Sequence, residues 1–331
     1  MLAARIHEDG GPEVLRVEEV PDPVAGPGEV LVRIRAASLN HLDIWVRKGL
    51  PSVPKPRILG ADGAGVVEAL GDGVEGLFVG QRVVLNPGLE HGDTITVVGE
   101  HRDGTHAELI AIEDAQVFPL DDTLSFEVAA AFPLVYETAY RMLVTRAAVQ
   151  EGEWALIWGI GGGVGTAAFE ICRALGVRTI VTSGHDDKLA RAVEWGADVA
   201  VNHAKADVVQ AVREATGKGV DVVVETVGEA TWARSLAAVR PSGRVVVCGA
   251  TSGPNPPAQL HRFWWKQLTV MGSTMGTRDD FLGAYELVRT GRAAVHVDRV
   301  YPLSEIAAAH ERLESGRQLG KIVLVMPGEG S

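Results

Sequence analysis

The sequence predicts an α/β protein in which an irregular all-β domain is followed by a doubly wound parallel-sheet domain. Up to about residue 120, short strand-like runs are separated by Gly and Pro. From about residue 125, apolar strands alternate with amphipathic helices, a pattern typical of a parallel sheet. The 331 residues, 46% of them hydrophobic, are enough for two domains that each bury a core.

The first predicted domain covers residues 1–124 and contains short strands. Its clearest strand-like runs are 29–37, 63–70 and 81–85, each bounded by Gly or Pro. A short helix is expected to begin at the NHLD turn, residues 40–43, and to continue through Trp45. This part of the chain is therefore expected to be mainly β structure.

The second predicted domain covers residues 125–264 and begins with a helical stretch, 126–143. Strands are predicted at 154–158, 178–183, 199–201, 220–225 and 243–248. Helices are predicted near 164–175, 186–195, 206–216 and 231–239. Because strand and helix alternate, the connections should be crossovers and the strands parallel.

The last predicted segment, residues 265–331, follows a Pro-rich stretch at 252–259. It contains predicted strands at 268–272, 297–301 and 321–325 and predicted helices near 278–290 and 304–315. A segment of this size cannot bury a core alone. We therefore expect it to complete the parallel sheet and the first domain.

Composition narrows the possible partners. Asp and Glu outnumber Lys and Arg by 43 to 31, a net charge of −12, which opposes binding to nucleic acid or to an anionic membrane. No apolar stretch approaches the roughly 20 residues of a membrane span. The two cysteines, Cys172 and Cys248, are too few for a disulfide framework and indicate a reducing compartment. These features predict a cytoplasmic protein with a small-molecule substrate.

A glycine-rich junction between a strand and a helix predicts a phosphate-binding loop. Gly159, Gly162 and Gly163 follow strand 154–158, and Val164 begins the helix near 164–175. Such a loop lets the backbone approach a pyrophosphate at the helix N-terminus. The spacing is GxxGxxG, completed by Gly165, rather than GxGxxG. A tight turn without a ligand is the alternative.

The end of the second parallel strand predicts which dinucleotide binds. An acidic residue there accepts hydrogen bonds from the ribose hydroxyls of NAD, whereas this chain has Ser183. A small hydroxyl leaves room for a 2′-phosphate, and Lys188 and His203 could supply charge or donors. NADPH is therefore favoured over NADH. Asp186 and Asp187 argue mildly against it, although a helix start also favours acids, and Lys188 could simply be a solvated helix lysine.

Several ordered motifs resemble the medium-chain dehydrogenase/reductase superfamily over essentially the whole chain. They include SLNHLDIWVRKG (38–49), LGADGAGVVEALG (59–71), WGIGGGVGTAA (158–168), FWWKQLTVMGSTMGT (263–277) and GKIVLV (320–325). The chain resembles most the group of zinc-independent quinone oxidoreductases and zinc-type alcohol dehydrogenase-like proteins. This resemblance implies a GroES-like irregular β domain beside a Rossmann domain, and we expect a homodimer or homotetramer.

The resemblance also indicates where zinc would bind in zinc-dependent members. The positions of the Cys and His ligands hold Asn40 and Ala61 here, and the segment PLVYETAY contains no cysteine. The four cysteines of a structural zinc site are also missing after residue 88. We therefore expect no metal. The loop histidines His91, His101 and His106 are interpreted as polar surface residues.

The polar NHLD turn is the candidate catalytic site. By resemblance Asn40 and Asp43 match residues of the nicotinamide and substrate pocket, and Asn40 could donate a hydrogen bond to a substrate carbonyl. His41 has the ordinary pKa best suited to proton delivery near neutral pH, and Trp45 could form a pocket wall. The alternative is local: Asn40 and Asp43 as helix-capping residues and Trp45 as core.

Four further residues match cofactor-contacting positions of the family, and each could instead be a small packing residue. These are Thr138, Cys248, Ala250 and Ser273. Without zinc as a Lewis acid, a substrate that spreads developing charge over its own π-system is favoured. We therefore predict an NADPH-dependent oxidoreductase that reduces quinones or α,β-unsaturated carbonyls by direct hydride transfer. Alternatives are an alcohol dehydrogenase with zinc on ligands such as His41 and Asp62, and a nucleotide-binding sensor or structural protein with little turnover.

Overall fold

The computed structural model describes residues 1–92 and 94–327 and divides into two compact units. Unit 1 consists of Met1–Leu134 and Val295–Ser331, and unit 2 of Val135–Ala294. The predicted boundaries after residues 124 and 264 differ from this division. Helix α2 (Phe126–Ala131) buries Ala129, Ala130 and Ala131 and packs on strands of unit 1, so the first boundary moves later. The chain then stays in unit 2 until Ala294, about 30 residues beyond the second predicted boundary.

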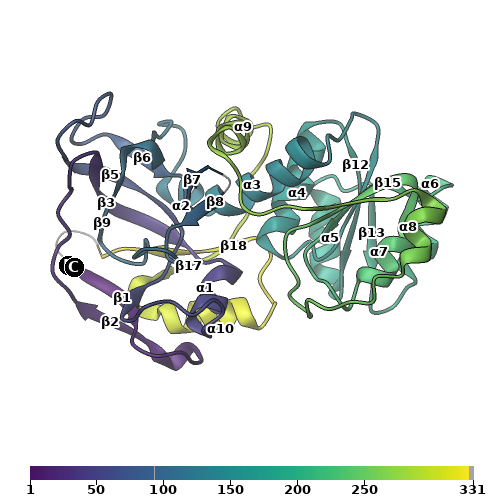
Figure 1. Cartoon of the computed structure of the whole chain (residues 1–331), viewed down its shortest axis with the longest axis horizontal. Helices are drawn as coiled ribbons and strands as arrows, with labels where there is room; N and C mark the ends of the chain where they lie inside the picture. Colours follow the sequence, from purple (N-terminus) through teal and green to yellow (C-terminus); the bar gives the residue numbers. More distant parts are fainter. Residues whose placement is uncertain (93, 328–331) are drawn as a thin grey trace. The chain divides into compact units, whose positions relative to one another are not determined.

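Unit 2 contains a sheet of six parallel strands, drawn in Figure 1. In spatial order they are β13 (Val199–Asn202), β12 (Arg178–Ser183), β11 (Trp154–Ile157), β14 (Val220–Glu225), β15 (Val239–Val247) and β16 (Thr269–Gly272). The order reverses at β11, which is the doubly wound Rossmann topology. The fold class predicted for this unit is therefore confirmed.

Helices connect consecutive strands of this sheet. They are α4 (Gly163–Ala174), α5 (Asp186–Glu194), α6 (Val208–Thr216), α7 (Trp232–Ala238) and α8 (Leu260–Lys266), and α9 (Arg278–Arg289) follows the last strand, β16. Right-handed crossovers place α4 and α5 on one face and α6 and α7 on the other, and the contacts of α4 with α9 and of α6 with α7 agree with this arrangement. Covered on both faces, every residue of β14 is buried.

Three local features between residues 126 and 267 differ from the predicted elements. The expected helix over 126–143 is divided into α2, α3 (Pro133–Tyr140) and a π-helical turn at Arg141–Arg146, because Pro133 starts a new helix. Strand β15 begins at Val239 rather than at 243. Helix α8 (Leu260–Lys266) was not predicted, and its flanking Gln259 and Gln267 both have left-handed backbone conformations.

Unit 1 contains two main sheets. The larger follows the order β10 (Val117–Pro119), β6 (Arg82–Leu85), β5 (Asp62–Leu70), β3 (Glu29–Ser38), β18 (Lys321–Val325) and β17 (Val297–Pro302), with β9 (Leu109–Glu113) also on β3. The smaller joins β2 (Leu15–Glu19), β1 (Leu2–Ile6) and β4 (Arg57–Ile58). A separate hairpin joins β7 (Gly88–His91) and β8 (Thr94–Val97).

The register of β3, β5 and β18 positions the candidate site of unit 1. Ser38, at the end of β3, pairs with Asp62 at the start of β5 and with Val323 of β18. Helix α1 (His41–Arg47) begins directly after β3 and contacts α10 (Ile306–Glu314), which connects β17 to β18. The C-terminal segment therefore completes the sheet of unit 1; the last four residues of the predicted segment 265–331 lie outside the described residues. Among the helices of the described part, none is long and apolar enough to span a membrane.

Candidate functional site

A buried ionic cluster forms where β3, β5 and β18 meet. We call Ser38, Asn40, Asp62 and Lys321 the ionic cluster; each is at most 4% exposed. Asp62 Oδ2 accepts hydrogen bonds from Ser38 Oγ (3.0 Å), Asn40 Nδ2 (2.9 Å) and Lys321 Nζ (3.1 Å). Lys321 Nζ also donates to Asn40 Oδ1. A buried carboxylate is tolerated here because an ammonium group and several donors surround it.

Asn40 and Asp43 stabilise the start of α1. Asn40 has extended backbone angles, and its N–H donates to Asp43 Oδ2 (2.7 Å). The other Asp43 oxygen accepts from the Gly60 N–H (2.9 Å), which ties the helix start to the segment before β5. Burial raises the pKa of Asp43. Asp43 thus has a clear structural role, while the Asn40 side chain belongs to the ionic cluster.

His41 and Trp45 lie on the more exposed side of α1. The His41 side chain is half-buried, Trp45 is 36% exposed, and their ring centroids are 6.5 Å apart. Burial, and then the charge of Lys321, lower the pKa of His41. The imidazole is therefore neutral at neutral pH and holds a proton less readily than an ordinary histidine.

His106 corrects one expectation, because it is completely buried rather than a surface residue. Its ring packs against Gly60, with Nε2 3.5 Å from the Ser38 carbonyl oxygen, and stands edge-on to His310 with centroids 6.4 Å apart. His310 Nδ1 accepts from Arg47 Nη1 (3.0 Å). Burial lowers the pKa of both histidines. His106 is buried because residues distant in the sequence, such as Ser38 and His310, pack around its ring. Its place in a loop did not predict this burial.

The sequence reasoning missed Lys321, and it considered Asp62 only as a possible zinc ligand. The available signal was the motif GKIVLV, in which a lysine opens an otherwise apolar strand. Within residues 1–92 and 94–327, no group of three His, Cys, Asp or Glu side chains is arranged to hold a metal ion.

The glycine loop, residues 159–165, connects β11 to α4 in unit 2. Gly159 has a φ of +70°, and a Cβ on Gly165 would lie 2.5 Å from the Gly159 carbonyl oxygen. Gly162 is the N-cap of α4, followed by Gly163 and Val164 in its first turn. The close packing and the open helix N-terminus fit a dinucleotide pyrophosphate, the group expected from the sequence.

The end of β12 carries the predicted cofactor-selecting residues. Ser183 is buried, its Oγ accepts from the His185 N–H (3.1 Å), and its carbonyl accepts from the His203 N–H (3.1 Å). Lys188 is 6% exposed, so it is not the solvated lysine of the alternative interpretation. Burial, and then the charge of Arg234, lower the pKa of His203. The three predicted residues therefore lie on neighbouring elements, β12, α5 and the segment after β13.

Of the four remaining predicted cofactor residues, three follow the ends of parallel strands. Cys248 and Ala250 follow β15, and Ser273 follows β16, where its N–H donates to the Val247 carbonyl (2.8 Å). Because parallel strands end at one edge, these residues share the edge of the glycine loop. Burial raises the pKa of Cys248 to about 12, so it is a neutral thiol. Thr138 lies on α3 and is buried.

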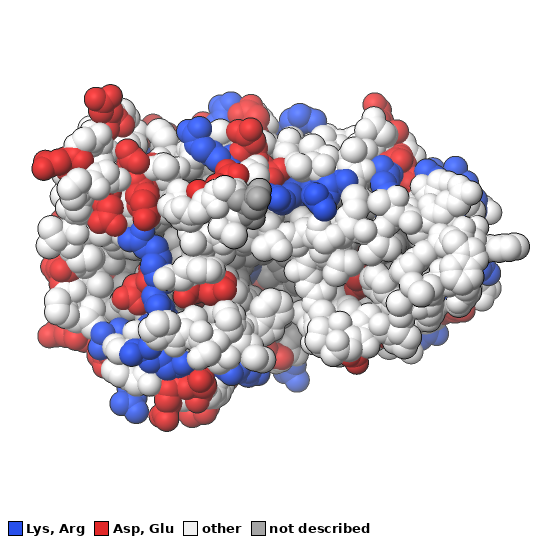
Figure 2. Space-filling view, in the orientation of Figure 1, with Lys and Arg blue, Asp and Glu red and all other residues white. Residues whose placement is uncertain are grey.

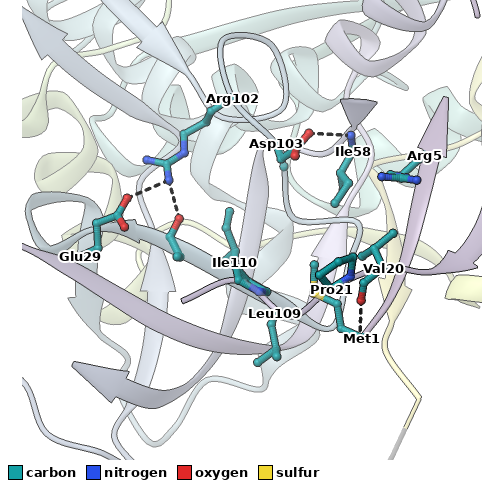
Figure 3. A pocket seen from close by; sticks show the side chains of 13 residues that line it. Met1, Arg5, Val20, Pro21, Glu29, Ile58, Arg102, Asp103, Leu109 and Ile110 are labelled. Atoms are coloured by element: carbon teal, nitrogen blue, oxygen red, sulfur yellow. Dashed lines mark hydrogen bonds and ion pairs between the residues drawn. The ribbon is translucent and has the colours of Figure 1, made fainter. Parts of the chain in front are cut away.

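Unit 1 also has a surface pocket of about 440 Å³ between β1, β9 and the chain near Pro21, drawn in Figure 3. It shares no lining residue with the ionic cluster. Arg102, which lines it, pairs with Glu29 and Glu113, and Arg5 pairs with Glu18. Its arginines are thus neutralised within the protein, and nothing assigns an anionic ligand to this pocket.

The comparisons with known proteins agree with the two units. The alcohol dehydrogenase GroES-like domain model matches residues 26–122, and the zinc-binding dehydrogenase model matches residues 163–290. Quinone oxidoreductase of Homo sapiens is 30% identical, with 98% of each chain covered. The solved structure of an NAD-dependent alcohol dehydrogenase is 41% identical with a TM-score of 0.95, covering 99% of this chain and 100% of that one.

A third similar protein differs in activity from the first two. The 2-octenoyl-CoA carboxylase reductase CinF, solved with NADP and 2-octenoyl-CoA, is 26% identical with a TM-score of 0.92, covering 99% of this chain and 88% of that one. Together with the parallel sheet, these similarities identify a nicotinamide-dependent oxidoreductase. The chain belongs to the medium-chain dehydrogenase/reductase superfamily and is an NAD(P)-dependent oxidoreductase.

Proposed function

We propose that the protein is an NADPH-dependent reductase of quinones or α,β-unsaturated carbonyls that works without zinc. When bound, the nicotinamide cofactor supplies a hydride to the electrophilic carbon of such an acceptor. The glycine loop would hold the pyrophosphate, and Ser183, Lys188 and His203 would lie toward the 2′-phosphate. The similarity to human quinone oxidoreductase over 98% of both chains supports this class of acceptor.

The observation that carries the proposal is the Lys321 ammonium, bonded to both Asn40 and Asp62. The resemblance places Asn40 at a zinc-ligand position, and Asp62 follows the second such position, Ala61. A divalent cation at this place would have to displace a buried ammonium group that already neutralises the carboxylate. Hydrogen bonds alone activate a carbonyl less than a Lewis acid does, which suits substrates that delocalise charge themselves.

We propose that Asn40 is the donor to the substrate oxygen. Its amide carries two N–H groups, of which one donates to Asp62, so the second can stabilise the charge that develops on the oxygen. His41, half-buried on α1, is proposed to relay a proton from solvent to the reduced substrate, taking up a proton at one ring nitrogen as it gives one from the other. Because its pKa is lowered, the neutral ring that such a relay requires is the prevailing form near neutral pH. Asp43 holds the helix start that carries Asn40 and His41, and Trp45, 36% exposed on the same helix, is proposed as a pocket wall.

The deciding experiment follows NADPH and NADH oxidation with quinones, enones, aldehydes and ketones, with the metal content measured on the same sample. We expect turnover with quinones or enones, no loss on chelation and well under one zinc per chain. Stoichiometric metal removed together with activity would instead support an alcohol dehydrogenase with ligands such as His41 and Asp62. Tight NADPH binding without turnover would support a nucleotide sensor.

A matched pair of variants tests whether Asn40 takes part in the reaction. Asn40→Leu removes both amide donors at similar volume and should lower kcat and kcat/KM together by about tenfold to a thousandfold. Asn86→Leu is the control, because Asn86 is a buried asparagine of unit 1 outside the ionic cluster. It should lower stability without changing kcat of the folded enzyme. Equal kcat in the Asn40 and Asn86 variants would show that Asn40 does not take part in the reaction.

We also propose self-association through the β16 edge of unit 2. Trp264 and Trp265 on α8 are 66% and 84% exposed, Leu260 is 61% exposed, and Figure 2 shows few charged side chains over α8. Strand β16 ends the sheet, and two copies of one edge can pair antiparallel about a twofold axis. Sedimentation should show a dimer that Trp265→Lys weakens. A monomeric parent protein at micromolar concentration would overturn this.

A further inference from the structure

Lys321 is a buried ammonium group whose partners are few and well defined. Its side chain is 4% exposed at the start of β18, and it donates to Asn40 Oδ1 and to Asp62 Oδ2. Nζ lies closer to the amide oxygen of Asn40 than to the carboxylate of Asp62. The contact with Asn40 is therefore at least as direct as the ion pair.

The partners of Asn40 determine which way its amide faces. An ammonium group only donates hydrogen bonds, so the side of the amide toward Lys321 must be the oxygen. A carboxylate only accepts, so the side toward Asp62 must be the nitrogen, at 2.9 Å. Exchanging oxygen and nitrogen would place two donors together at Lys321 and two acceptors together at Asp62. The two charges thus select a single orientation.

Asp62 is held in place by contacts that do not involve Lys321. Its Oδ1 accepts from the Leu134 N–H (2.8 Å), and its Oδ2 accepts from Ser38 Oγ (3.0 Å). The position of the carboxylate is therefore set by β3 and by the start of α3. What Lys321 adds is charge neutralisation of Asp62 and a donor to the Asn40 oxygen.

We infer that Lys321 is a positioning residue for Asn40: its ammonium group fixes the orientation of the amide and polarises the amide N–H groups for the substrate oxygen. A positive charge on the amide oxygen strengthens the N–H groups as donors in a buried environment. The inference rests on the proposed function of Asn40. The competing interpretation is that Lys321 serves only as the counter-ion of Asp62.

A double variant separates the two roles. Lys321→Met alone would leave a buried carboxylate unpaired and could unfold the protein, whereas Lys321→Met with Asp62→Asn removes both charges together. Asp62→Asn leaves one acceptor oxygen where Asp62 has two, so the double variant should unfold at a lower temperature whichever role Lys321 has. If Lys321 is only a counter-ion, the folded double variant keeps the parental kcat. If Lys321 positions Asn40, the folded double variant loses about tenfold to a hundredfold in kcat with a smaller change in KM. Lys321→Arg alone, which keeps a charged donor, should retain most of the parental kcat.

A spectroscopic readout tests the orientation without turnover. The chain has four asparagines, so ¹⁵N-asparagine labelling gives four side-chain amide signals, and the signal missing in Asn40→Leu is that of Asn40. We expect the two amide protons of Asn40 to resonate far apart in the parental protein and in Lys321→Arg. In the double variant Asp62→Asn adds a fifth side-chain amide, so the Asn40 signal is identified there as the one lost when Asn40→Leu is added. We expect its two protons to move together and to exchange faster with solvent. An unchanged Asn40 signal in the double variant would overturn the inference.

A control variant and two further outcomes distinguish a failure of this inference from a failure of the proposed function. Lys266 is also buried in part, and its Nζ donates to the carbonyls of Leu236 and Ala237 in the last turn of α7 and of Val239 at the start of β15. Lys266→Met should lower the melting temperature and leave the Asn40 signal and kcat unchanged. If the parental protein reduces no acceptor, the proposed function fails while the amide signals still decide the orientation. If the double variant does not fold, a Lys321→Arg protein that lacks the parental Asn40 signal overturns the inference.

Discussion

The glycine loop of unit 2 and the ionic cluster of unit 1 are assembled from the chain in opposite ways. All residues of the glycine loop lie within 159–165, and the groups it would offer to a pyrophosphate are backbone N–H groups. The ionic cluster joins Ser38 and Asn40 to Asp62 and to Lys321, which is 281 residues from Asn40 along the chain. A backbone site can be encoded locally, whereas a site of paired buried charges depends on the strand register that brings the charges together.

The largest effect is expected from Gly165→Ala, which tests whether unit 2 binds through close backbone packing. The new Cβ would lie 2.5 Å from the Gly159 carbonyl oxygen, so the loop or α4 must shift. Stability should fall by about 1–3 kcal/mol and dinucleotide affinity by more than tenfold, measured by thermal unfolding and calorimetric titration.

Gly162→Ala is the matched control for that prediction. Its Cβ would lie 3.6 Å from the same oxygen, an ordinary contact, and Gly162 has a φ of −81°. Its melting temperature should stay close to that of the parent. If both variants unfold at the same temperature, close packing at Gly165 is not what the loop requires.

The next effect concerns the charge at the end of β12. Ser183→Asp places a carboxylate where a 2′-phosphate would lie and should shift the ratio of NADPH to NADH affinity toward NADH by about tenfold to a hundredfold. Ser183→Ala removes the hydroxyl without adding charge and should keep the parental preference. The opposite outcome is a preference for NADH, and one protein of similar structure is an NAD-dependent alcohol dehydrogenase. A parental protein that binds both cofactors equally, or prefers NADH, would contradict the choice of NADPH.

The predictability of each site follows from how it is encoded. The strands and helices of unit 2 were predicted because near-continuous apolar runs such as Val220–Glu225 identify buried parallel strands. The glycine loop was found because its glycines are adjacent. Helix α8 was missed, since its apolar residues are exposed and produce no amphipathic pattern. Lys321 was missed because its partners, Asn40 and Asp62, belong to other strands and turns.

His106 illustrates the same limit in unit 1. A histidine in a loop is usually exposed, but here the ring is enclosed by Gly60, Ser38 and His310. The burial follows from the pairing of β3 with β5 and from the position of α10. No local pattern around residue 106 contains this information.

The smallest predicted effect tests the long-range packing of unit 1 through its dependence on pH. Burial, and then the charges of His106 and Arg47, hold the pKa of His310 well below its usual range, so the folded protein keeps this imidazole neutral. The unfolded chain takes up a proton near pH 6.5. Below that pH the unfolded state binds more protons than the folded state, and the free energy of unfolding decreases as the pH falls.

His310→Gln can still accept from Arg47 but cannot titrate, so it should reduce the loss of stability between pH 7.5 and 5.5 by up to about 1.4 kcal/mol per pH unit. Urea unfolding at several pH values measures this slope, with His91→Gln, on an exposed position of β7, as the control that should leave it unchanged. A His310→Gln protein with the parental slope would show that His310 gains its proton as easily in the folded protein as in water, and therefore that the packing of α10 does not exclude solvent from it.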